Sequence, residues 1–572
     1  MDTELVKTQD KYWSVSEPLP ATAKESLIAY PPIVRQLLFN RDVINNGQAD
    51  LYLNPGEHLL GDFRLMPDIE LATERIAKAI DTGEKIAIYG DFDSDGITAT
   101  ALLHEALAML GADIIHYIPN RIKEGHGLNE RALNLLVKEN VDLVVTVDCG
   151  VDGLQQSEDY PQSLDIIVTD HHIPGKVLPP VFAVVNPMRE DSVYPFPELA
   201  GVGVALKLVQ SIYKKYNKTW DASLLELVAV GTVADVAPLI GENRYLVNLG
   251  LNLLKKTKRL GLLALGRRMG VNFSNLNEET IGFVIAPHIN AAGRLGDPEI
   301  GFNLLITKEK SEALRITESL YILNKERQKL TSDIYKRSEE MWSQSRESNE
   351  KIIIVGAADF SVGISGLAAS RLVEKYYLPS IVYQEINGEI RASARSIPEV
   401  DITSLLAKCS DLLTKFGGHN QAAGFIAPIA NLDSIKSRLQ TIIEEVADGW
   451  RTKPAISIDS QVFPSELTGS VNKFIDLMAP YGAHNAAPVF IAKDLLVVSK
   501  RMIGVDSAHL KFVLQEKNSG NYWSAVGFRM GIKFDSISES IDIVYKFKKT
   551  QYKVDSRAHP GFELEILDFR SA

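Results

Sequence analysis

Residues 85–96 read KIAIYGDFDSDG, a short apolar run that ends in glycine and is followed at once by three aspartates. The run has the length of a buried strand, and the residues after it, TATALLHEALAMLGA, repeat apolar side chains at helical spacing. Gly96 permits a tight entry into that helix. The stretch therefore predicts a strand, a polar turn and a helix, which together form the first unit of an α/β fold.

The strand-like pattern returns three times further along the chain. VDLVVTVDCG spans residues 141–150, LDIIVTDHH spans 164–172 and VFAVVNP spans 181–187. Helical patterns alternate with these runs, and DIELATERIAKAI, residues 68–80, supplies one before the first strand. Alternating strands and helices predict a parallel sheet that is covered on both faces.

Acidic and histidine side chains follow three of the predicted strands. They are Asp91, Asp93 and Asp95 after the first strand, Asp148 after the second, and Asp170, His171 and His172 after the third. Because ligand sites in open parallel sheets lie at the carboxyl ends of the strands, we expect these groups to converge. Alternate side chains of an extended segment share a face, so the first three aspartates should project together and Cys149 should turn away from Asp148.

Such a gathering of carboxylates indicates bound cations. Several carboxylates within a few ångströms stay ionised only when cations lie among them. Carboxylate and imidazole ligands without thiolate suit Mn²⁺ or Mg²⁺. Asp235, in the segment GTVADVAPL, offers a fourth acidic position. A single aspartate at a strand end is usually a turn or cap residue, but acidic and histidine groups at three successive strand ends favour a metal site.

The remaining segments predict several domains, as the chain length of 572 residues suggests. Residues 307–355 contain neither glycine nor proline, which favours a long connecting helix, broken at most once. A second α/β pattern begins with KIIIVG at residues 351–356, and many short β-rich segments near the C-terminus are typical of a small antiparallel barrel. We expect an N-terminal arm (1–60), a parallel-sheet domain (61–305), a connecting helix (306–349), a smaller α/β domain (350–450) and a barrel (451–572).

Composition limits the class of protein. The net charge of −12 weighs against nucleic-acid binding, yet a metal-dependent nuclease needs carboxylates, and residues 451–572 carry +3 against −15 for the rest. A basic binding module and ordinary scatter of surface charge explain that difference equally well. We find no membrane-length apolar run, no signal-peptide pattern and only two cysteines, Cys149 and Cys409. We therefore expect a cytoplasmic protein, and the self-contained multidomain design favours a monomer.

The strand-end motifs also carry a family resemblance. GDFDSDG, TVDCG, TDHH and GTVADVAPL, in this order, resemble the four motifs of the DHH phosphoesterase family. IPNR with EGHGL, LAGVGVA, INAAGRLGD, RASARS and GGHNQAAGF narrow the resemblance to the RecJ branch of that family. GGH…AAG is similar to the signature of a DHHA1 domain, and PYGAHNAAPVF looks like the entry to an oligonucleotide-binding (OB) barrel. The matches run from about residue 60 to 530.

The resemblance implies a role for each matching residue. Ligands of two divalent cations, Mn²⁺ or Mg²⁺, are implied at Asp93, Asp95, Asp148, His171 and Asp235, with Asp148 in the bridging position. His172 matches a residue that faces the scissile phosphate, and Asp91 is an outer-shell partner of the metals. Arg121, Ser393 and Arg395 match residues that hold a 5′-terminal phosphate. Arg294 and His419 should line the substrate path, and surface ion pairs are the alternative reading for Arg121 and Arg395.

The function implied is that of a single-stranded-DNA-specific exonuclease. It would hydrolyse phosphodiester bonds from 5′ to 3′ by two-metal-ion catalysis, release 5′-mononucleotides, and serve DNA repair and recombination. The resemblance also implies a single-strand-binding protein and a RecQ-type helicase as partners. A small-substrate enzyme acting on oligoribonucleotides or cyclic dinucleotides is the alternative, although a barrel has no obvious purpose there. A catalytically dead DNA-binding scaffold is a further alternative, but no metal ligand is missing.

The sequence leaves the roles of several residues along the expected DNA path undecided, and a few other residues depart from the family pattern. Candidate barrel contacts are Lys546, Lys548, Lys549, Tyr522 and Trp523. The lysines are equally consistent with protection of an edge strand, and the aromatic residues with core packing. His288 stands where an arginine is common and Ser361 where a histidine is common, and the barrel motif reads AHN (483–485) where a glycine-containing form is more usual. These departures affect strand binding and leave the metal set intact.

Overall fold

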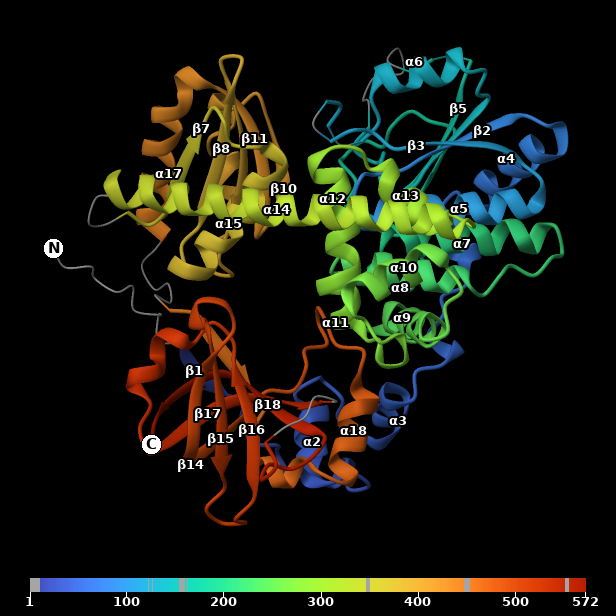
Figure 1. Ribbon diagram of the computed structural model, residues 1–572. Coiled ribbons are helices and arrows are strands. Elements are labelled where there is room, and N and C mark those ends of the chain that lie inside the picture. The colour runs from blue at the N-terminus through green and yellow to red at the C-terminus, as the bar shows by residue number, and fades with distance from the viewer. Residues whose placement is uncertain are drawn as a thin grey trace.

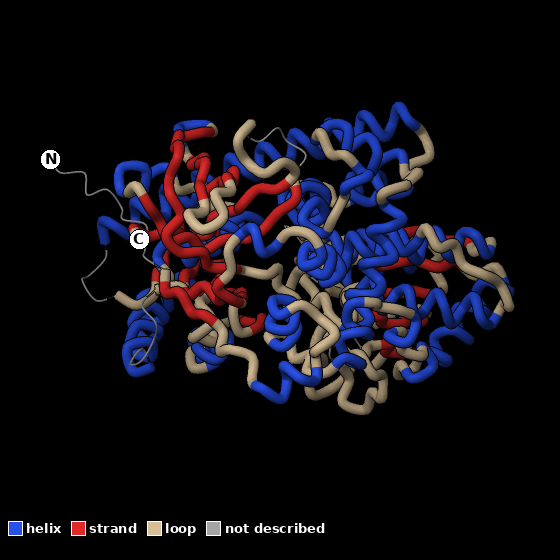
Figure 2. Tube along the Cα trace, turned by 90° about the horizontal axis from the view of Figure 1, so that it is seen from below, coloured by secondary structure: helices blue, strands red, loops and turns tan. Residues whose placement is uncertain are grey.

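The structure is a computed structural model that describes residues 11–121, 123–125, 127–153, 160–161, 163–345, 350–446, 453–550 and 555–572. His126 of the EGHGL motif lies outside these residues. Three domains are visible in Figure 1, with two α/β domains joined by one long helix above a smaller barrel. Figure 2 shows the strands of the barrel on the side of both chain ends, and those of the first sheet at the opposite end.

A five-stranded parallel sheet organises the first domain, as the sequence predicts. Its order is β3-β2-β4-β5-β6, and every neighbouring pair is parallel. The strands are β2 (Lys85–Tyr89), β3 (Asp113–Tyr117), β4 (Leu143–Thr146), β5 (Asp165–Thr169) and β6 (Ala183–Val185). The sequence pattern did not indicate β3, which lies at an edge, because none of its side chains is fully buried.

Helices cover both faces of this sheet. Ile86 and Ile88 pack towards α4 (Ile69–Thr82), α5 (Ser94–Leu110) and α7 (Gly201–Lys215), whereas Ala87 and Tyr89 pack towards α6 (Glu130–Lys138). This alternation is what a strand buried on both faces requires. The domain continues with α8 (Leu224–Ala234), α9 (Gly241–Leu254), α10 (Leu260–Met269), α11 (Glu278–Thr280), a π-helical turn (Ile281–Ile285), α12 (Ala286–Leu295) and α13 (Glu299–Ile306).

A single helix, α14 (Lys310–Ser345), connects the two α/β domains. Its 36 residues correspond to about 54 Å at 1.5 Å per residue, and it is not broken. The helix packs first on α10, α12 and α13 of the first domain and then on α15 (Val362–Tyr376) of the second. The long connecting helix predicted from the absence of glycine and proline is therefore present.

The second domain is a five-stranded mixed sheet of order β10-β11-β9-β8-β7, in which only β7 and β8 are parallel to each other. The strands are β7 (Ile353–Ala357), β8 (Ser380–Ile386), β9 (Glu389–Arg395), β10 (Lys415–His419) and β11 (Ala422–Pro428). Its helices are α15, α16 (Ile402–Ala407) and α17 (Leu432–Val446). One core of this domain packs β8, β9 and β11 against α16 and α17, and another lies between β7, α14 and α15.

The third domain is a barrel, because the two strands at the ends of its sheet also pair with each other. Strands β14 (Phe490–Ile503), β15 (His509–Gln515), β16 (Tyr522–Gly527), β18 (Phe562–Ser571) and β17 (Ser540–Lys549) follow one another, and β14 also pairs with β17. All these pairings are antiparallel except that of β16 with β18. Before the barrel the chain forms β12 (Ala455–Ile458), β13 (Ser460–Gln461) and α18 (Ser470–Met478).

The N-terminal segment is more than a peripheral arm, and this part of the expectation was wrong. β1 (Tyr12–Val15) pairs with β12, and α1 (Ala21–Ser26), α2 (Pro32–Phe39) and α3 (Asn46–Leu53) follow it. Side chains of α2 and α3 are buried in the same core as the barrel. Each helix has only two turns or so, too few for its apolar period to stand out in the sequence. Among the described residues we find no helix long and apolar enough to cross a membrane.

Candidate active site

The turn after β2 and the first turn of α5 carry the three aspartates of the first motif. Asp93 is the N-cap of α5, and its Oδ1 accepts hydrogen bonds from the backbone amides of Asp95 (2.9 Å) and Gly96 (3.2 Å). Asp91 and Asp93 offer oxygens close to Asp148. Asp95 already belongs to the first turn of the helix, and its carboxylate lies 4.0 Å from His171 Nε2. All three aspartates therefore contribute to the same acidic centre, Asp91 and Asp93 beside Asp148 and Asp95 beside His171 and Asp235.

The N-terminus of α7 holds the buried carboxylate of Asp95. Its Oδ2 accepts a hydrogen bond from the Gly201 amide (2.7 Å), and its Oδ1 accepts one from the Val202 amide (3.0 Å). A helix N-terminus favours a negative charge at this position. Burial and the charge of Asp93 nevertheless raise the pKa of Asp95 to about 7. The glycine of LAGVGVA thus supplies an amide to an aspartate, a role that the sequence did not reveal.

The helices α7 and α8 approach the acidic side chains so closely that one position on each helix must be a glycine. A Cβ atom at Gly201 would lie 2.5 Å from Asp148 Oδ1, and one at Gly231, on α8, would lie 2.6 Å from Asp95 Oδ1. Both distances are below any real Cβ contact. The helices α7 and α8 can therefore reach the carboxylates only where they carry no side chain.

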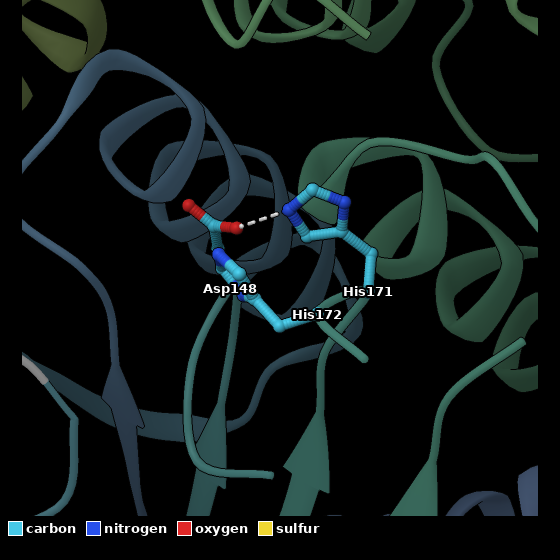
Figure 3. Close-up of side chains that lie close together, drawn as sticks. All are labelled: Asp148, His171 and His172. Carbon is cyan, nitrogen blue, oxygen red and sulfur yellow. Dashed lines mark ion pairs between the residues drawn. The ribbon is translucent and has the colours of Figure 1, made fainter. Parts of the chain in front are cut away.

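Asp148 and His171 face each other at the centre of the site (Figure 3). Asp148 follows β4 in the left-handed region (φ 61°), and its Oδ1 lies 3.1 Å from His171 Nε2. Neither atom is satisfied by a hydrogen bond among the described residues, although both are buried. Burial, with the charges of Asp95 and Asp93, raises the pKa of Asp148. Burial and the charge of His172 lower the pKa of His171 to about 4, so the ring is neutral and offers a lone pair.

Asp170 holds the second histidine. Its Oδ1 accepts hydrogen bonds from the backbone amides of His171 (2.7 Å) and His172 (3.1 Å) and from His172 Nδ1 (2.7 Å). Its Oδ2 accepts one from the Val151 amide (2.9 Å). Burial by itself favours a neutral ring, but the hydrogen bond and the charge of Asp170 outweigh it and raise the pKa of His172 to about 9. The sequence placed Asp170 in the motif without a role, and the structure shows that it positions His172.

Asp235 reaches the same centre from the end of α8. It is the C-cap of that helix, and its Oδ2 lies 3.9 Å from His171 Nε2. Burial and the charges of Asp95 and Asp93 raise its pKa. The next residue, Val236, has a φ of 61°, which is strained for a β-branched side chain. Strained backbone of this kind is often found at functional sites.

These residues form three overlapping groups in which the ligand atoms lie within 4.8 Å of one another. The groups are Asp148, His171 and His172; Asp95, His171 and Asp235; and Asp91, Asp93 and Asp148. All five residues proposed as metal ligands from the sequence are among them. Oxygen and neutral imidazole donors, carboxyl groups whose pKa is raised by burial and by mutual repulsion, and two unsatisfied buried atoms fit divalent cations.

A second cluster, of arginines, lies between the two α/β domains. Arg121 packs over the Phe92 ring at 5.0 Å from its centroid, and Arg294 Nη1 donates to the Gly363 carbonyl (3.2 Å). Arg395 Nη1 donates to the Ala394 carbonyl (2.8 Å). None of these three arginines has a carboxylate ion-pair partner within the described ranges, so the ion-pair alternative for Arg121 and Arg395 was wrong.

Ser393 and His419 come from the sheet of the second domain. Ser393 and Arg395 are two residues apart on β9 and therefore share a face of that sheet. His419 is the exposed last residue of β10, and its charge contributes to the low pKa of His171. His419 of the second domain therefore lies close to the acidic groups of the first domain.

The departures from the family pattern have local explanations. His288 is buried on α12, where its Nδ1 lies 2.6 Å from the Val284 carbonyl and its Nε2 lies 3.1 Å from Asn324 Nδ2 of α14. Ser361 takes the N-cap position of α15, and His484 lies in a turn with a φ of 59°. His288 thus ties α12 to the connecting helix.

Most of the candidate barrel contacts have other roles. Trp523 is fully buried and stacks on His559, so the core reading is the right one. Lys548 pairs with Glu279 and Glu565, and Lys549 pairs with Asp476. The other candidates, Lys546 and Tyr522, are half-buried. Phe528, which is 53% exposed beyond the end of β16, is an aromatic residue that the sequence analysis missed, because one exposed phenylalanine has no sequence signal.

Comparison with known proteins agrees with this architecture. Three domain models match the chain: the DHH family N-terminal domain at residues 85–232, the DHHA1 domain at 349–445 and the RecJ OB domain at 458–559. The single-stranded-DNA-specific exonuclease RecJ of Bacillus subtilis is 35% identical over 530 residues. That match covers 91% of this chain, which spans only 65% of the Bacillus relative. The RecJ of Haemophilus influenzae is 30% identical over 551 residues, with 91% and 94% of the two chains covered.

Solved structures give the same result. RecJ of Thermus thermophilus in complex with Mn²⁺ has a TM-score of 0.81 and 27% identity, covering 98% of this chain and 80% of that one. The same protein in complex with Mg²⁺ has a TM-score of 0.76 and 26% identity, covering 98% and 78%. The domains, their order and their arrangement agree, and the chain belongs to the RecJ family.

Proposed function

We propose that this protein is a metal-dependent exonuclease that degrades single-stranded DNA from its 5′ end and releases 5′-mononucleotides. The observation that carries the proposal is the convergence of Asp93, Asp95, Asp148, His171 and Asp235, which come from four separate segments, in overlapping groups whose ligand atoms lie within 4.8 Å of one another. Membership of the RecJ family, whose curated members are named single-stranded-DNA-specific exonucleases, supports the substrate class.

These five residues would hold two divalent cations, Mn²⁺ or Mg²⁺. A pair of such ions activates water and stabilises charge on the phosphodiester. Asp148 and His171 each belong to two of the three ligand groups, and both would hold the ions at the centre of the site. The α7 amides fix Asp95, and neutral His171 presents its Nε2 to the centre. Asp91, which shares a ligand group with Asp93 and Asp148, orders the metal site from its outer side.

His172 faces the phosphoryl oxygens in this mechanism. Asp170 holds its Nδ1 and keeps the ring protonated, since the pKa of His172 is about 9. Because Nδ1 of the protonated His172 ring is held by Asp170, its Nε2–H can donate to the negative charge that develops on the scissile phosphate. The attacking water loses a proton to solvent, the departing 3′-oxygen takes up a proton and leaves as an alcohol, and no serine or cysteine nucleophile is required.

Direction and strand choice would come from the space between the two α/β domains. Arg121, Ser393 and Arg395 would hold the 5′-terminal phosphate, while Arg294 and His419 line the path from that phosphate to the acidic centre. Guanidinium groups without carboxylate partners suit a phosphate monoester. The barrel would retain the rest of the strand by backbone charge and base stacking, and exposed Phe528 is a candidate platform.

A labelled-strand assay tests this function. Single strands labelled at the 5′ or the 3′ end, incubated with and without Mn²⁺, should release labelled mononucleotide first from the 5′ end and only with metal. Asp148→Ala should abolish hydrolysis and leave strand binding nearly intact. Asp113→Ala is the matched control, because this aspartate is exposed at the opposite end of the sheet. Preference for dinucleotides, or hydrolysis from the 3′ end, would refute the proposal.

The cellular setting is also part of the proposal. A 5′-to-3′ single-strand exonuclease suits DNA repair and recombination in the cytoplasm. A single-strand-binding protein that delivers the strand and a RecQ-type helicase that exposes it are the partners consistent with such an activity. A monomer suffices for the mechanism, because one chain carries all the residues invoked. Sedimentation of the purified protein, alone and with each partner, tests these assignments.

A further inference from the structure

Phe92 stands between two aspartates of the acidic centre, and its side chain contacts an arginine assigned to the strand end. Asp91 and Asp93 share a ligand group with Asp148, in which the ligand atoms lie within 4.8 Å of one another. The Phe92 side chain is buried, and the guanidinium of Arg121 lies over its ring at 5.0 Å from the centroid. Three consecutive residues of the first motif therefore contact both the acidic centre and the proposed 5′-phosphate pocket.

This kind of contact suits an arginine that has to bind a phosphate. Such an arginine must be held in place while its N–H groups stay available for the phosphate oxygens. A carboxylate partner would accept hydrogen bonds from those groups and compete with the phosphate. An aromatic face attracts the guanidinium through its π electrons and is no such competitor. Arg121 has the ring contact and, within the described ranges, no ion pair with a carboxylate.

The backbone on both sides of Arg121 is fixed by hydrogen bonds. Asn120 Nδ2 donates to the carbonyl of Gly296, just after α12 (2.6 Å), and the Asn120 amide donates to Glu124 Oε2 (2.7 Å). Glu124 Oε1 also accepts a hydrogen bond from the hydroxyl of Tyr117, the last residue of β3 (2.5 Å). Since the loop itself is anchored, the aromatic ring is the contact that fixes the guanidinium at the end of the side chain.

The backbone of Phe92 is fixed as well. A Cβ atom at Gly293 of α12 would lie 2.2 Å from the Phe92 carbonyl oxygen, so the helix packs directly on the motif. The next residue, Arg294, is in similar contact with the second domain, because a Cβ at Gly363 of α15 would lie 2.5 Å from the Arg294 carbonyl oxygen. Phe92 therefore cannot shift without displacing α12, and its ring keeps a constant position relative to the acidic centre.

We propose that Phe92 is a positioning residue for recognition of the 5′-terminal phosphate. Its ring holds the Arg121 guanidinium at a fixed place relative to the acidic centre, so that a bound terminal phosphate sets which phosphodiester reaches that centre. The inference rests on the proposed function and assigns part of its end specificity to a side chain that acts through an arginine. Loss of the ring should weaken recognition of the terminal phosphate more than it weakens binding of the rest of the strand.

The experiment measures the end preference, which is the ratio of the dissociation constants of a 5′-hydroxyl and a 5′-monophosphate strand of one sequence. Fluorescence anisotropy with the Asp148→Ala protein and Mn²⁺ gives this ratio without consuming the strands. In that background, Phe92→Leu should lower the end preference about fivefold or more, as expected for the loss of a cation–π contact at a partly buried site. Phe92→Tyr keeps an aromatic face and should retain most of the preference.

A double-mutant cycle shows whether the ring acts through the guanidinium. If it does, Phe92→Leu/Arg121→Ala should lower the end preference no further than Arg121→Ala alone, because the second change removes nothing that the first has left. Phe302→Leu is the matched control. This phenylalanine of α13 is fully buried and stacks on His116 at 4.0 Å between ring centroids, so its loss should leave the end preference unchanged.

Several outcomes would overturn the inference. They are an unchanged end preference in a folded Phe92→Leu protein, and additive losses in the double-mutant cycle. Equal losses for both strand ends, with weaker Mn²⁺ binding of Phe92→Leu in titration calorimetry, would also overturn it, since Phe92 would then support only the acidic centre. Failure of the protein with Asp148 intact to hydrolyse any strand would instead reject the proposed function, whereas the affinity ratios would still decide the role of Phe92.

Discussion

Substitution of one glycine tests the geometry of the metal site most directly. In Gly201→Ala the new Cβ would lie 2.5 Å from Asp148 Oδ1, whereas ordinary contact begins at 3.4 Å. Asp148 or α7 must therefore move by about 0.9 Å. The Gly201 amide also binds Asp95 Oδ2, so a shift of the helix weakens that hydrogen bond as well. One methyl group thus disturbs two of the proposed ligands.

The expected effect on catalysis is large and that on folding is moderate. A misplacement of about 1 Å costs on the order of 100-fold in rate. Overpacking in a dense interior costs about 1–3 kcal/mol of unfolding free energy. The assays are Mn²⁺-dependent hydrolysis of a 5′-phosphorylated strand, Mn²⁺ affinity by titration calorimetry without DNA, and urea unfolding.

The same helix provides the control. A Cβ at Gly203 would meet only the flexible end of Leu199, at 3.2 Å, so Gly203→Ala should retain activity and Mn²⁺ affinity. A folded Gly201→Ala protein that binds Mn²⁺ and hydrolyses DNA as well as wild type would refute the assignment of Asp148 and Asp95 to the metal site.

Three further predictions concern charge. In metal-free protein the raised pKa of Asp95, about 7, means that its protonated form is favoured in the fold, so stability should fall as pH rises from the ordinary value of 3.8 to about 7 and level off above it. Mn²⁺ should remove this decline, and thermal unfolding at about pH 5 and pH 7 with EDTA or Mn²⁺ measures both. Lys207→Met leaves the fully buried Glu242 without its ion-pair partner and should cost about 3–5 kcal/mol in urea unfolding, most of which Lys207→Met/Glu242→Leu should restore. Arg395→Ala should raise KM for a 5′-phosphorylated strand about tenfold or more and leave a 5′-hydroxyl strand nearly unchanged; equal effects on both ends would place Arg395 outside the terminal-phosphate pocket.

The sequence was most informative where acidic and histidine residues recur at the same place, immediately after a predicted strand. Acidic and histidine residues follow β2, β4 and β5, and the parallel arrangement of these strands brings them together. The neighbourhood of Asp148 and His171 could therefore be expected without coordinates, whereas Asp235, at the C-cap of α8, was indicated only by the segment GTVADVAPL. The long helix was predictable for a similar reason, because the absence of glycine and proline over many residues is a strong local signal.

Tertiary contacts account for what could not be predicted. Nothing in LAGVGVA indicates that its amides bind Asp95, since that contact depends on where α7 begins relative to α5. Likewise, DFDSDG reads as an extended segment until the helix is seen to start at Ser94. Trp523 and the first helices belong to the core of the barrel, and burial of single side chains has no period by which it could be detected.

The connecting helix sets the distance and the relative rotation between the two α/β domains. Each residue inserted into α14 or deleted from it would displace the second domain by about 1.5 Å and turn it by about 100° about the helix axis. Arg395 and His419 would then rotate away from the acidic centre, although no residue of either site had changed. The number of residues between Lys310 and Ser345 is therefore expected to be constrained by the distance and orientation that it sets between the two domains.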